Sequence, residues 1–215
     1  MSTVGYAQPA RTSTPTLFGR VMALVALTVA AATLGVWIAR GWGGAGWFIA
    51  WLLGLGCLIG LNAASARGNT GLALTLLIAF GLLIGISVAA TINYYAATDP
   101  TAVRQAFGAT ALFVGVLGAG GYAVRRDLSF LYRIAFWLLL ALLVAGFVLI
   151  FVHIPGGQQI YAVLGLAIFG AYTIFDFNRL RRANMDASIP IAAGIFLDIF
   201  NIFLFFLQIF GGSSR

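Results

Sequence analysis

Two aspartates within strongly apolar sequence are the residues of this chain most suited to chemistry. Asp176 and Asp198 are two of the five acidic residues among 215, and both are surrounded by aliphatic and aromatic side chains. A carboxyl group at membrane depth costs roughly 2.5 kcal/mol or more, so it usually faces the protein interior and marks a functional site. Two carboxyls at matching depth on neighbouring helices can share one proton, which predicts a pH-sensitive pair.

The positions of these aspartates along two predicted helices place them at similar depths. If the first helix runs to about Asn184, Asp176 lies eight residues from its end, and Asp198 lies ten residues after Ser188, where the next helix begins. At about 1.5 Å per residue, the two depths are roughly 12 and 15 Å. The helices are antiparallel neighbours joined by a short loop, so the two carboxyl groups can meet.

Each aspartate also lies on a polar stripe of its helix. Tyr172, Asp176 and Arg179 follow i, i+4, i+7 spacing, and Asn201 follows Asp198 by three residues. Residues at these spacings share one helix face. One alternative is that Asp176 only forms an ion pair with Arg179 at the end of its helix. A second is that Asp198 is a protonated carboxyl that only hydrogen-bonds a neighbour.

Arg67 ends the second apolar run on the same side of the membrane as Asp176. It is a candidate partner that could capture Asp176 and act as a latch. It is equally well explained as one of the charges that orient the chain in the bilayer. Both interpretations of Arg67 remain open at the level of sequence.

Composition places the chain among membrane proteins that cross the bilayer several times. Hydrophobic residues make up 62% and charged residues 8%, and the mean hydropathy is +1.04. At about 20 residues per span, the length allows about seven spans and leaves no room for a soluble domain. We therefore expect one all-α membrane domain at residues 17–211, a flexible N-terminal tail at 1–16 and a short C-terminal tail at 212–215.

Seven apolar runs predict seven transmembrane helices. The first run resembles a signal peptide, but it is too long and is not followed by a cleavage site, so we interpret it as a retained span. Apart from its polar stripe, the last run is ringed by apolar residues, which predicts that its helix is central in the bundle. The runs lie at about 17–39, 47–65, 70–95, 101–124, 130–152, 160–180 and 189–210.

Arginine placement predicts the orientation of the bundle. All 12 basic residues are Arg and all five acidic residues are Asp. Nine arginines lie in the N-terminal tail or near the connections after the second, fourth and sixth spans, and three lie on the other side. By the positive-inside rule, the N-terminus is cytoplasmic and the C-terminus lies outside. Scattered arginines at span ends indicate lipid headgroup contact rather than nucleic-acid binding.

The residue inventory excludes several classes of protein. Cys57 and His153 are the only cysteine and histidine, so no intrachain disulfide and no His/Cys metal site can form. Cys57 is explained as a core residue and His153 as an interfacial one. The absence of Lys excludes a retinal Schiff base, the absence of Glu excludes paired-Glu intramembrane proteases, and no Gly-x-Ser-x-Gly motif supports a Ser–His protease. We expect no enzymatic activity and no bound cofactor.

Three stretches resemble the Bax inhibitor-1 family, also called the transmembrane BAX inhibitor motif or YccA-like family. The most specific is Tyr-Thr-Ile-Phe-Asp at 172–176 together with Phe-Leu-Asp-Ile-Phe-Asn-Ile-Phe at 196–203; the others lie at 70–87 and 109–129. The likeness covers about residues 18–211. It implies a seven-helix fold with a central last helix. The lack of a targeting sequence and the exclusive use of Arg and Asp as charged residues predict a bacterial inner membrane.

The resemblance also implies a function, namely a proton-sensitive leak that carries Ca²⁺ across the membrane. The family's paired aspartates fall on Asp176 and Asp198, and its second-span arginine falls on Arg67. No Glu stands where bacterial relatives can carry one near the outer mouth, so the likeness gives no route for the ion into the protein. Ca²⁺ prefers six to eight oxygen ligands, whereas Asp176, Asp198, Asn201 and Tyr172 supply about four, so only a transient Ca²⁺ site is expected.

A second class of function fits the same residues. The chain could bind and restrain other membrane proteins, with the aspartates serving only the structure. The basic segment at 179–182 would then be a surface for partner contacts. Ion flux through the purified protein distinguishes the two hypotheses.

Overall fold

The computed structural model describes residues 14–42, 46–152 and 154–212, so the predicted tails and His153 lie wholly or largely outside the described residues. Within these ranges the chain forms seven long helices, each long and apolar enough to cross a membrane. This confirms the predicted all-α, seven-span fold. The helices are α1 (Thr14–Ile38), α2 (Gly46–Ala66), α3 (Thr70–Thr98), α4 (Pro100–Ala123), α5 (Ser129–Phe151), α6 (Gly157–Arg182) and α7 (Ser188–Gly212), with the short 3-10 helix η1 (Met185–Ala187) before α7.

The helix boundaries follow local capping chemistry. Asn69 accepts a hydrogen bond from the Leu72 N–H at 3.1 Å, and Asp99 accepts one from the Ala102 N–H at 3.0 Å. Pro100 occupies the first turn of α4, where its missing N–H costs nothing. Gly156 precedes α6 with a φ of 72°, a backbone conformation that favours glycine. Capping therefore allows α3 and α4, and then α5 and α6, to follow one another with short turns.

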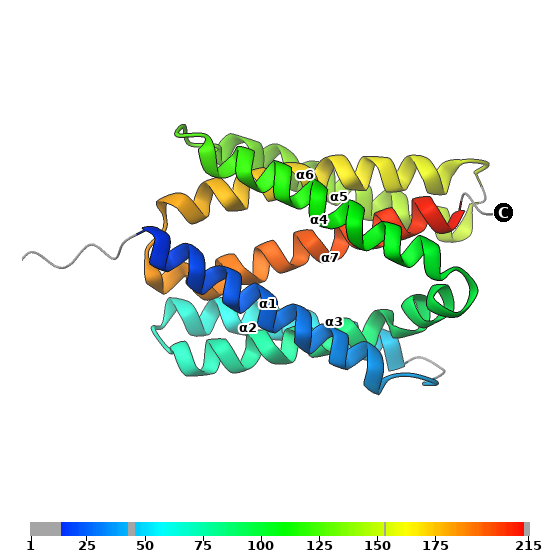
Figure 1. Ribbon diagram of the computed structural model, residues 1–215, viewed down its shortest axis with the longest axis horizontal. Coiled ribbons are helices and arrows are strands. Elements are labelled where there is room, and N and C mark those ends of the chain that lie inside the picture. The colour runs from blue at the N-terminus through cyan, green and yellow to red at the C-terminus, as the bar shows by residue number, and fades with distance from the viewer. Residues whose placement is uncertain (1–13, 43–45, 153, 213–215) are drawn as a thin grey trace, which may run out of the picture.

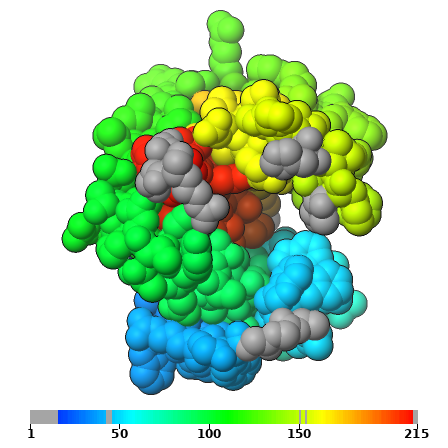
Figure 2. Space-filling view, turned by 90° about the vertical axis from the view of Figure 1, so that its right-hand side faces the viewer, coloured from blue at the N-terminus to red at the C-terminus, as the bar shows by residue number. Residues whose placement is uncertain are grey.

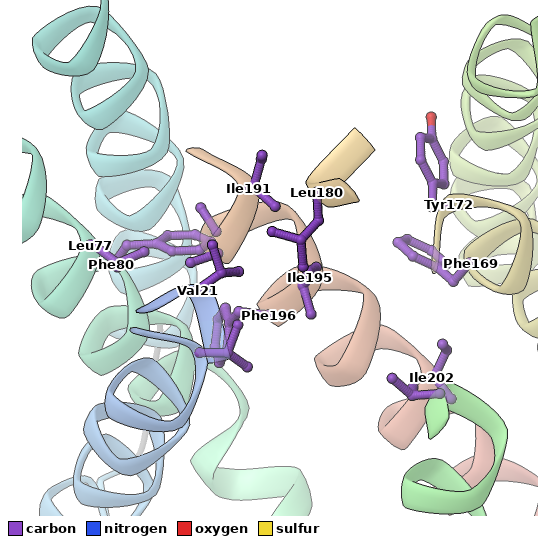
Figure 3. Packing of buried hydrophobic residues seen from close by; sticks show 14 of the residues in the cluster. Val21, Leu77, Phe80, Phe169, Tyr172, Leu180, Ile191, Ile195, Phe196 and Ile202 are labelled. Atoms are coloured by element: carbon purple, nitrogen blue, oxygen red, sulfur yellow. The ribbon is translucent and has the colours of Figure 1, made fainter. Parts of the chain in front are cut away.

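Helix α7 lies between two groups of three helices, with α1, α2 and α3 on one side and α4, α5 and α6 on the other (Figure 1). It packs against α1, α2, α3, α4 and α6, which confirms the predicted central position. Phe196 of α7 meets Phe80 of α3 edge-to-face at 5.6 Å. Figure 3 shows Leu77 and Phe80 on one side of α7 and Phe169 and Tyr172 of α6 on the other.

Helix α5 is the most peripheral of the seven. It packs mainly on α6, and the apolar side chains along most of its length are exposed. Exposed aliphatic and aromatic groups on a membrane span face hydrocarbon, so their exposure carries no hydrophobic cost. Burial is instead concentrated in α6 and α7, the two helices that carry the aspartates.

The two ends of the bundle differ in charge. The end where α1 starts and α7 begins holds most of the described arginines, and we call it the basic end. The opposite end, seen in Figure 2, holds the last turns of α1 and α7 and the described arginines Arg40 and Arg104. The basic end carries Arg20, Arg67, Arg125, Arg126, Arg133, Arg179, Arg181 and Arg182.

Small residues set the approach of α1 to α3. A Cβ added at Gly81 or Gly85 would overlap the α1 backbone at Thr28 or Ala32. These glycines let the two helices touch closely, as the small-xxx-small spacing predicts. Gly56 and Gly60 on α2 have the same spacing but do not pack against a backbone: a Cβ at Gly56 would meet nothing within 4 Å, and one at Gly60 would meet the Leu76 side chain.

Candidate functional site

Asp176 and Asp198 lie within the interface between α6 and α7, and both are buried, at 7% and 3% exposure. They are close enough for their charges to interact, as the matched depths predicted. The Asp176 carboxyl packs directly against Gly194, one turn before Asp198 on α7. A side chain at Gly194 would overlap that carboxyl, so the glycine provides the space that Asp176 occupies.

Thr173 is the polar neighbour of Asp198 on α6. Its hydroxyl donates to the carbonyl of Phe169 at 2.8 Å, and it lies within hydrogen-bonding reach of Asp198. While its one proton is donated to Phe169, the hydroxyl can accept a hydrogen bond from a protonated Asp198. Asp198 Oδ2 is buried without a hydrogen-bond partner among the described residues. This geometry suits an Asp198 that carries a proton, because an ionised buried carboxylate needs donors.

Tyr172, predicted to support the pair, is buried and close enough for both aspartates to act on it. Its ring contacts Tyr132 of α5 edge-to-face at 5.7 Å and Phe169 at 5.9 Å. The aromatic contacts fix the Tyr172 side chain on the α5 side of α6. It therefore belongs to the wall around the aspartates.

Asn201 is partly buried, and its amide nitrogen donates to the Leu197 carbonyl of its own helix at 2.8 Å. This bond lowers the cost of carrying an amide at membrane depth. It uses one of the two amide protons, and the amide oxygen is the atom that Asn201 can offer to an ion.

Neither candidate arginine partner forms an ion pair with Asp176 in the described residues. Arg179 is exposed, and it forms no ion pair with Asp176 within the described ranges, although its charge acts on that carboxyl. The alternative of a solvated Asp176–Arg179 pair is therefore wrong, because Asp176 is buried. Arg67 is exposed at the turn between α2 and α3, and no ion pair joins it to Asp176 in the described chain. Its latch role stays a prediction.

Asn178, which sequence reasoning missed, organises the basic end. It is fully buried on α6, two residues after Asp176. Its amide nitrogen donates to the carbonyls of Val124 at 2.7 Å and Arg126 at 3.1 Å, and its oxygen accepts from Arg182 at 2.8 Å. One side chain thus satisfies carbonyls at the end of α4 and in the loop after it.

Arg182 extends this contact to the loop between α4 and α5. Its guanidinium pairs with both carboxylate oxygens of Asp127, at 2.9 and 3.2 Å. The Ser129 hydroxyl and N–H also donate to Asp127 at 2.6 and 2.8 Å. The hydrogen bonds from Arg182, and then those from Ser129, hold the pKa of Asp127 well below its ordinary value. The basic segment at the end of α6 is therefore partly engaged within the molecule.

A polar cavity of about 460 Å³ lies at the opposite end, between the ends of α3, α5, α6 and α7. Gln208 of α7 donates to the side chain of Gln158 at 2.6 Å, and Tyr95 and Gln159 also line the cavity. The side-chain oxygens of these residues are uncharged, and the chain has no glutamate that could stand with them at this end. They supply ligands of the kind that a hydrated cation accepts.

An aromatic plug separates this cavity from the aspartates. The ring of Phe205 packs against Gly165, where a Cβ would overlap it. Phe205 is flanked by Tyr161 at 5.8 Å and Phe169 at 6.0 Å. Both helices are buried here, so the α6–α7 interface is closed in this conformation.

No group of three or more His, Cys, Asp or Glu that could hold a metal ion occurs in the described residues. The aspartate pair therefore offers two carboxylates, with Tyr172 beside them. This set is smaller than a resident Ca²⁺ site requires. It is compatible with brief contact between an ion and the pair.

The family model described as "Inhibitor of apoptosis-promoting Bax1" matches residues 14–215 of the chain. The chain belongs to the Bax inhibitor-1 family. It is 33% identical over 128 residues to a protein of Deinococcus radiodurans, covering 55% of this chain and 54% of that protein. It is 28% identical over 124 residues to a membrane protein of Vibrio cholerae, covering 56% and 55%.

A eukaryotic member of the Bax inhibitor-1 family is also similar. The "BI1-like protein" of Arabidopsis thaliana is 32% identical over 119 residues, covering 53% of this chain and 46% of that protein. The chain thus spans about half the length of the curated relatives it matches. Membership of the family establishes a membrane protein with several transmembrane helices.

Proposed function

We propose that this Bax inhibitor-1 family member is a pH-sensitive leak that lets Ca²⁺ cross a bacterial inner membrane, with Asp176 and Asp198 as proton sensor and gate. The observation that carries the proposal is the buried carboxyl pair. Asp176 packs on Gly194 of α7, and Asp198 holds an oxygen without a partner in the described structure. The proposal assigns transport rather than catalysis, with no bound cofactor.

The shared proton would act on the packing of α6 against α7. With one proton, the carboxyls can hydrogen-bond each other and hold the interface closed. Two ionised carboxylates repel each other and attract a cation. Two neutral carboxyls neither repel each other nor attract a cation. The direction of the pH response therefore tells which step opens the interface.

The proposed ion path uses the two ends of the α6–α7 interface. The polar cavity of Gln158 and Gln208 would admit the ion, and displacement of Phe205 from Gly165 would open the way to the aspartates. Tyr172 and the oxygen of Asn201 would contact the passing ion. Arg67 would capture Asp176 in the open state, and Arg179 would raise the local positive charge at the basic end.

Calcium flux into liposomes that contain the purified protein tests this proposal. We expect a Ca²⁺ flux whose rate changes with pH, and infrared bands of buried carboxyls that change over the same pH range. Asp176→Asn and Asp198→Asn keep the side-chain shape and remove the proton, so each should flatten the pH response. Asp186→Asn, in exposed η1, makes the same chemical change outside the pair and should leave the response intact.

Two results would contradict the proposal in different ways. If both variants keep the wild-type pH profile, the aspartate pair is not the sensor. If the wild type passes no cation at any pH, the protein is not a leak. In that case a second function takes its place.

The second candidate function is binding and restraint of other membrane proteins. It is favoured by exposed Arg179 beside a cavity of about 380 Å³ at the basic end. Arg181 and Arg182 contact the α4–α5 loop, so Arg179 is the arginine of this segment that we assign to a partner. Arg179→Gln should then abolish crosslinks from a photoreactive residue at Ala183 to a membrane partner.

A further inference from the structure

A lateral groove of about 950 Å³ separates α1 from α4 and is independent of the aspartate pair's chemistry. At the basic end, the rings of Phe18 on α1 and Tyr122 on α4 meet edge-to-face at 5.5 Å. Beyond this contact the groove keeps the two helices apart, and α7 is visible between them in Figure 1. Ile195 and Ile199 of α7 form its floor.

The lining of the groove suits hydrocarbon. Small residues on α4, among them Ala111, Gly115 and Ala119, leave room above the floor, and Val29 and Phe107 close the sides. Among the hydroxyl groups of the lining, that of Thr110 donates to the Ala106 carbonyl at 2.7 Å. Its only proton is therefore used within α4. An occupant gains burial of apolar surface here rather than hydrogen bonds.

The length of the groove matches one leaflet or more of a membrane. A smaller cavity of about 150 Å³ shares Val29, Phe107, Thr110 and Ile199 with the groove and continues it to Val36. From Phe18 to Val36, α1 rises about 27 Å at ~1.5 Å per residue. The hydrocarbon core of a bilayer is about 30 Å thick, so an extended acyl chain fits along the groove.

The shape argues against a helix as the occupant. A helix with side chains is about 10 Å wide. The contact between Phe18 and Tyr122 closes the groove at the basic end, so a partner helix could not lie along its full length. An acyl chain is narrower, so it can enter the groove from its open lateral side beneath the ring pair while its headgroup lies at the surface of the basic end.

Positive charge surrounds the same end. Arg20, Arg125 and Arg126 are exposed, and each lies within three residues of Phe18 or Ala123, the groove residues nearest this end. In the described part of the chain, none of the three forms an ion pair with a carboxylate. Guanidinium groups bind phosphate oxygens strongly, so an anionic headgroup complements this end.

We propose that the groove between α1 and α4 binds an acyl chain of an anionic phospholipid, whose phosphate lies against Arg20, Arg125 and Arg126. The apolar groove holds the chain, and the arginines select the headgroup. This site does not depend on the proposed ion leak.

Native mass spectrometry of protein taken from vesicles tests the proposal. The vesicles contain equal amounts of phosphatidylglycerol and phosphatidylcholine. We expect retained phosphatidylglycerol in excess of phosphatidylcholine. Replacing Arg125 and Arg126 by Gln should lower that excess by about fivefold for each arginine.

A second variant tests the groove itself. Gly115→Phe places a ring in open space within the groove and should reduce retained lipid of both kinds. Leu112→Phe, on the same helix but 71% exposed and outside the lining, is the matched control and should retain lipid like the wild type. Thermal unfolding of each variant checks that it folds.

Three outcomes would overturn the proposal. Equal retention of the two lipids would remove the role of the arginines. Full retention by a folded Gly115→Phe variant would place the lipid elsewhere. A wild-type mass that corresponds to two chains without lipid would show that a second copy covers the groove. If Gly115→Phe does not fold, the arginine variants decide the headgroup selection alone.

Discussion

At the scale of single residues, the aspartates depend on neighbours that carry no charge. Gly194 provides the space for the Asp176 carboxyl, and Thr173 faces Asp198 with its own proton already donated to Phe169. The protein interior lowers the cost of a carboxyl at this depth, because it provides fitted space and hydrogen-bond acceptors that lipid lacks. The pair is thus a property of the α6–α7 contact rather than of either helix.

Gly194→Ala tests the contact between Asp176 and α7. The added methyl group overlaps the carboxyl, so we expect a loss of about 1–3 kcal/mol in the free energy of unfolding, typical of overpacking. Asp176→Ala removes the carboxyl, and in that background the same change should cost less. Thermal unfolding of the single and double variants in detergent measures the difference. Gly108→Ala, which meets nothing within 4 Å on α4, should be neutral or slightly stabilising.

At the scale of elements, the end of α6 ties α4 and α5 together. Asn178 donates to carbonyls at the end of α4 and in the following loop, and Arg182 pairs with Asp127 in that loop. Because α6 also carries Asp176, these contacts fix the helix on one side while α7 packs on the other.

Asn178→Ala should destabilise the fold strongly. It leaves buried carbonyls of the α4–α5 connection without their donor, which costs about 1–3 kcal/mol. Asn62→Ala is the matched control, because exposed Asn62 bonds only the Leu58 carbonyl of its own helix, at 2.8 Å. Denaturation of both variants in the same detergent compares them. Equal stabilities would contradict the organising role of Asn178.

The ion pair of Asp127 predicts a pH dependence of a different kind. Its folded-state pKa lies below the ordinary value of about 3.9, so its contribution to stability is full above that pH. The contribution is lost as pH falls through the folded-state pKa. Asp127→Asn should therefore lower the melting temperature equally at pH 5 and pH 8, with a smaller difference below about pH 4. If Asp127→Asn also changed the pH profile of ion flux between pH 5 and 8, Asp127 would not be a purely structural residue.

At the scale of the whole molecule, α7 joins two groups of helices that otherwise meet at few places. The contacts of α7 with both groups supply the continuous core. The same arrangement leaves the groove between α1 and α4, because the two helices touch through Phe18 and Tyr122 at one end. A single central helix thus positions the aspartate site and the floor of the proposed lipid site.

The charge difference between the two ends predicts the orientation of the molecule. The basic end should face the cytoplasm, which places the N-terminus inside and the C-terminus outside. Single cysteines at Ser2 and Ser213, in a Cys57→Ala background, should show labelling of intact cells by an impermeant thiol reagent at Ser213 only. Labelling at Ser2 but not at Ser213 would show the opposite orientation, in which the polar cavity faces the cytoplasm.

The sequence by itself determined the spans, the central last helix and the two aspartates. Each is a local property: about 20 apolar residues mark a span, and a carboxyl within one stands out by its cost. Tertiary structure decided what lies beside them. One glycine among 27 makes room for Asp176, one asparagine holds the α4–α5 connection, and Arg67 forms no ion pair with Asp176 in the described chain. These choices depend on how the helices pack against one another, which residue type and spacing do not specify.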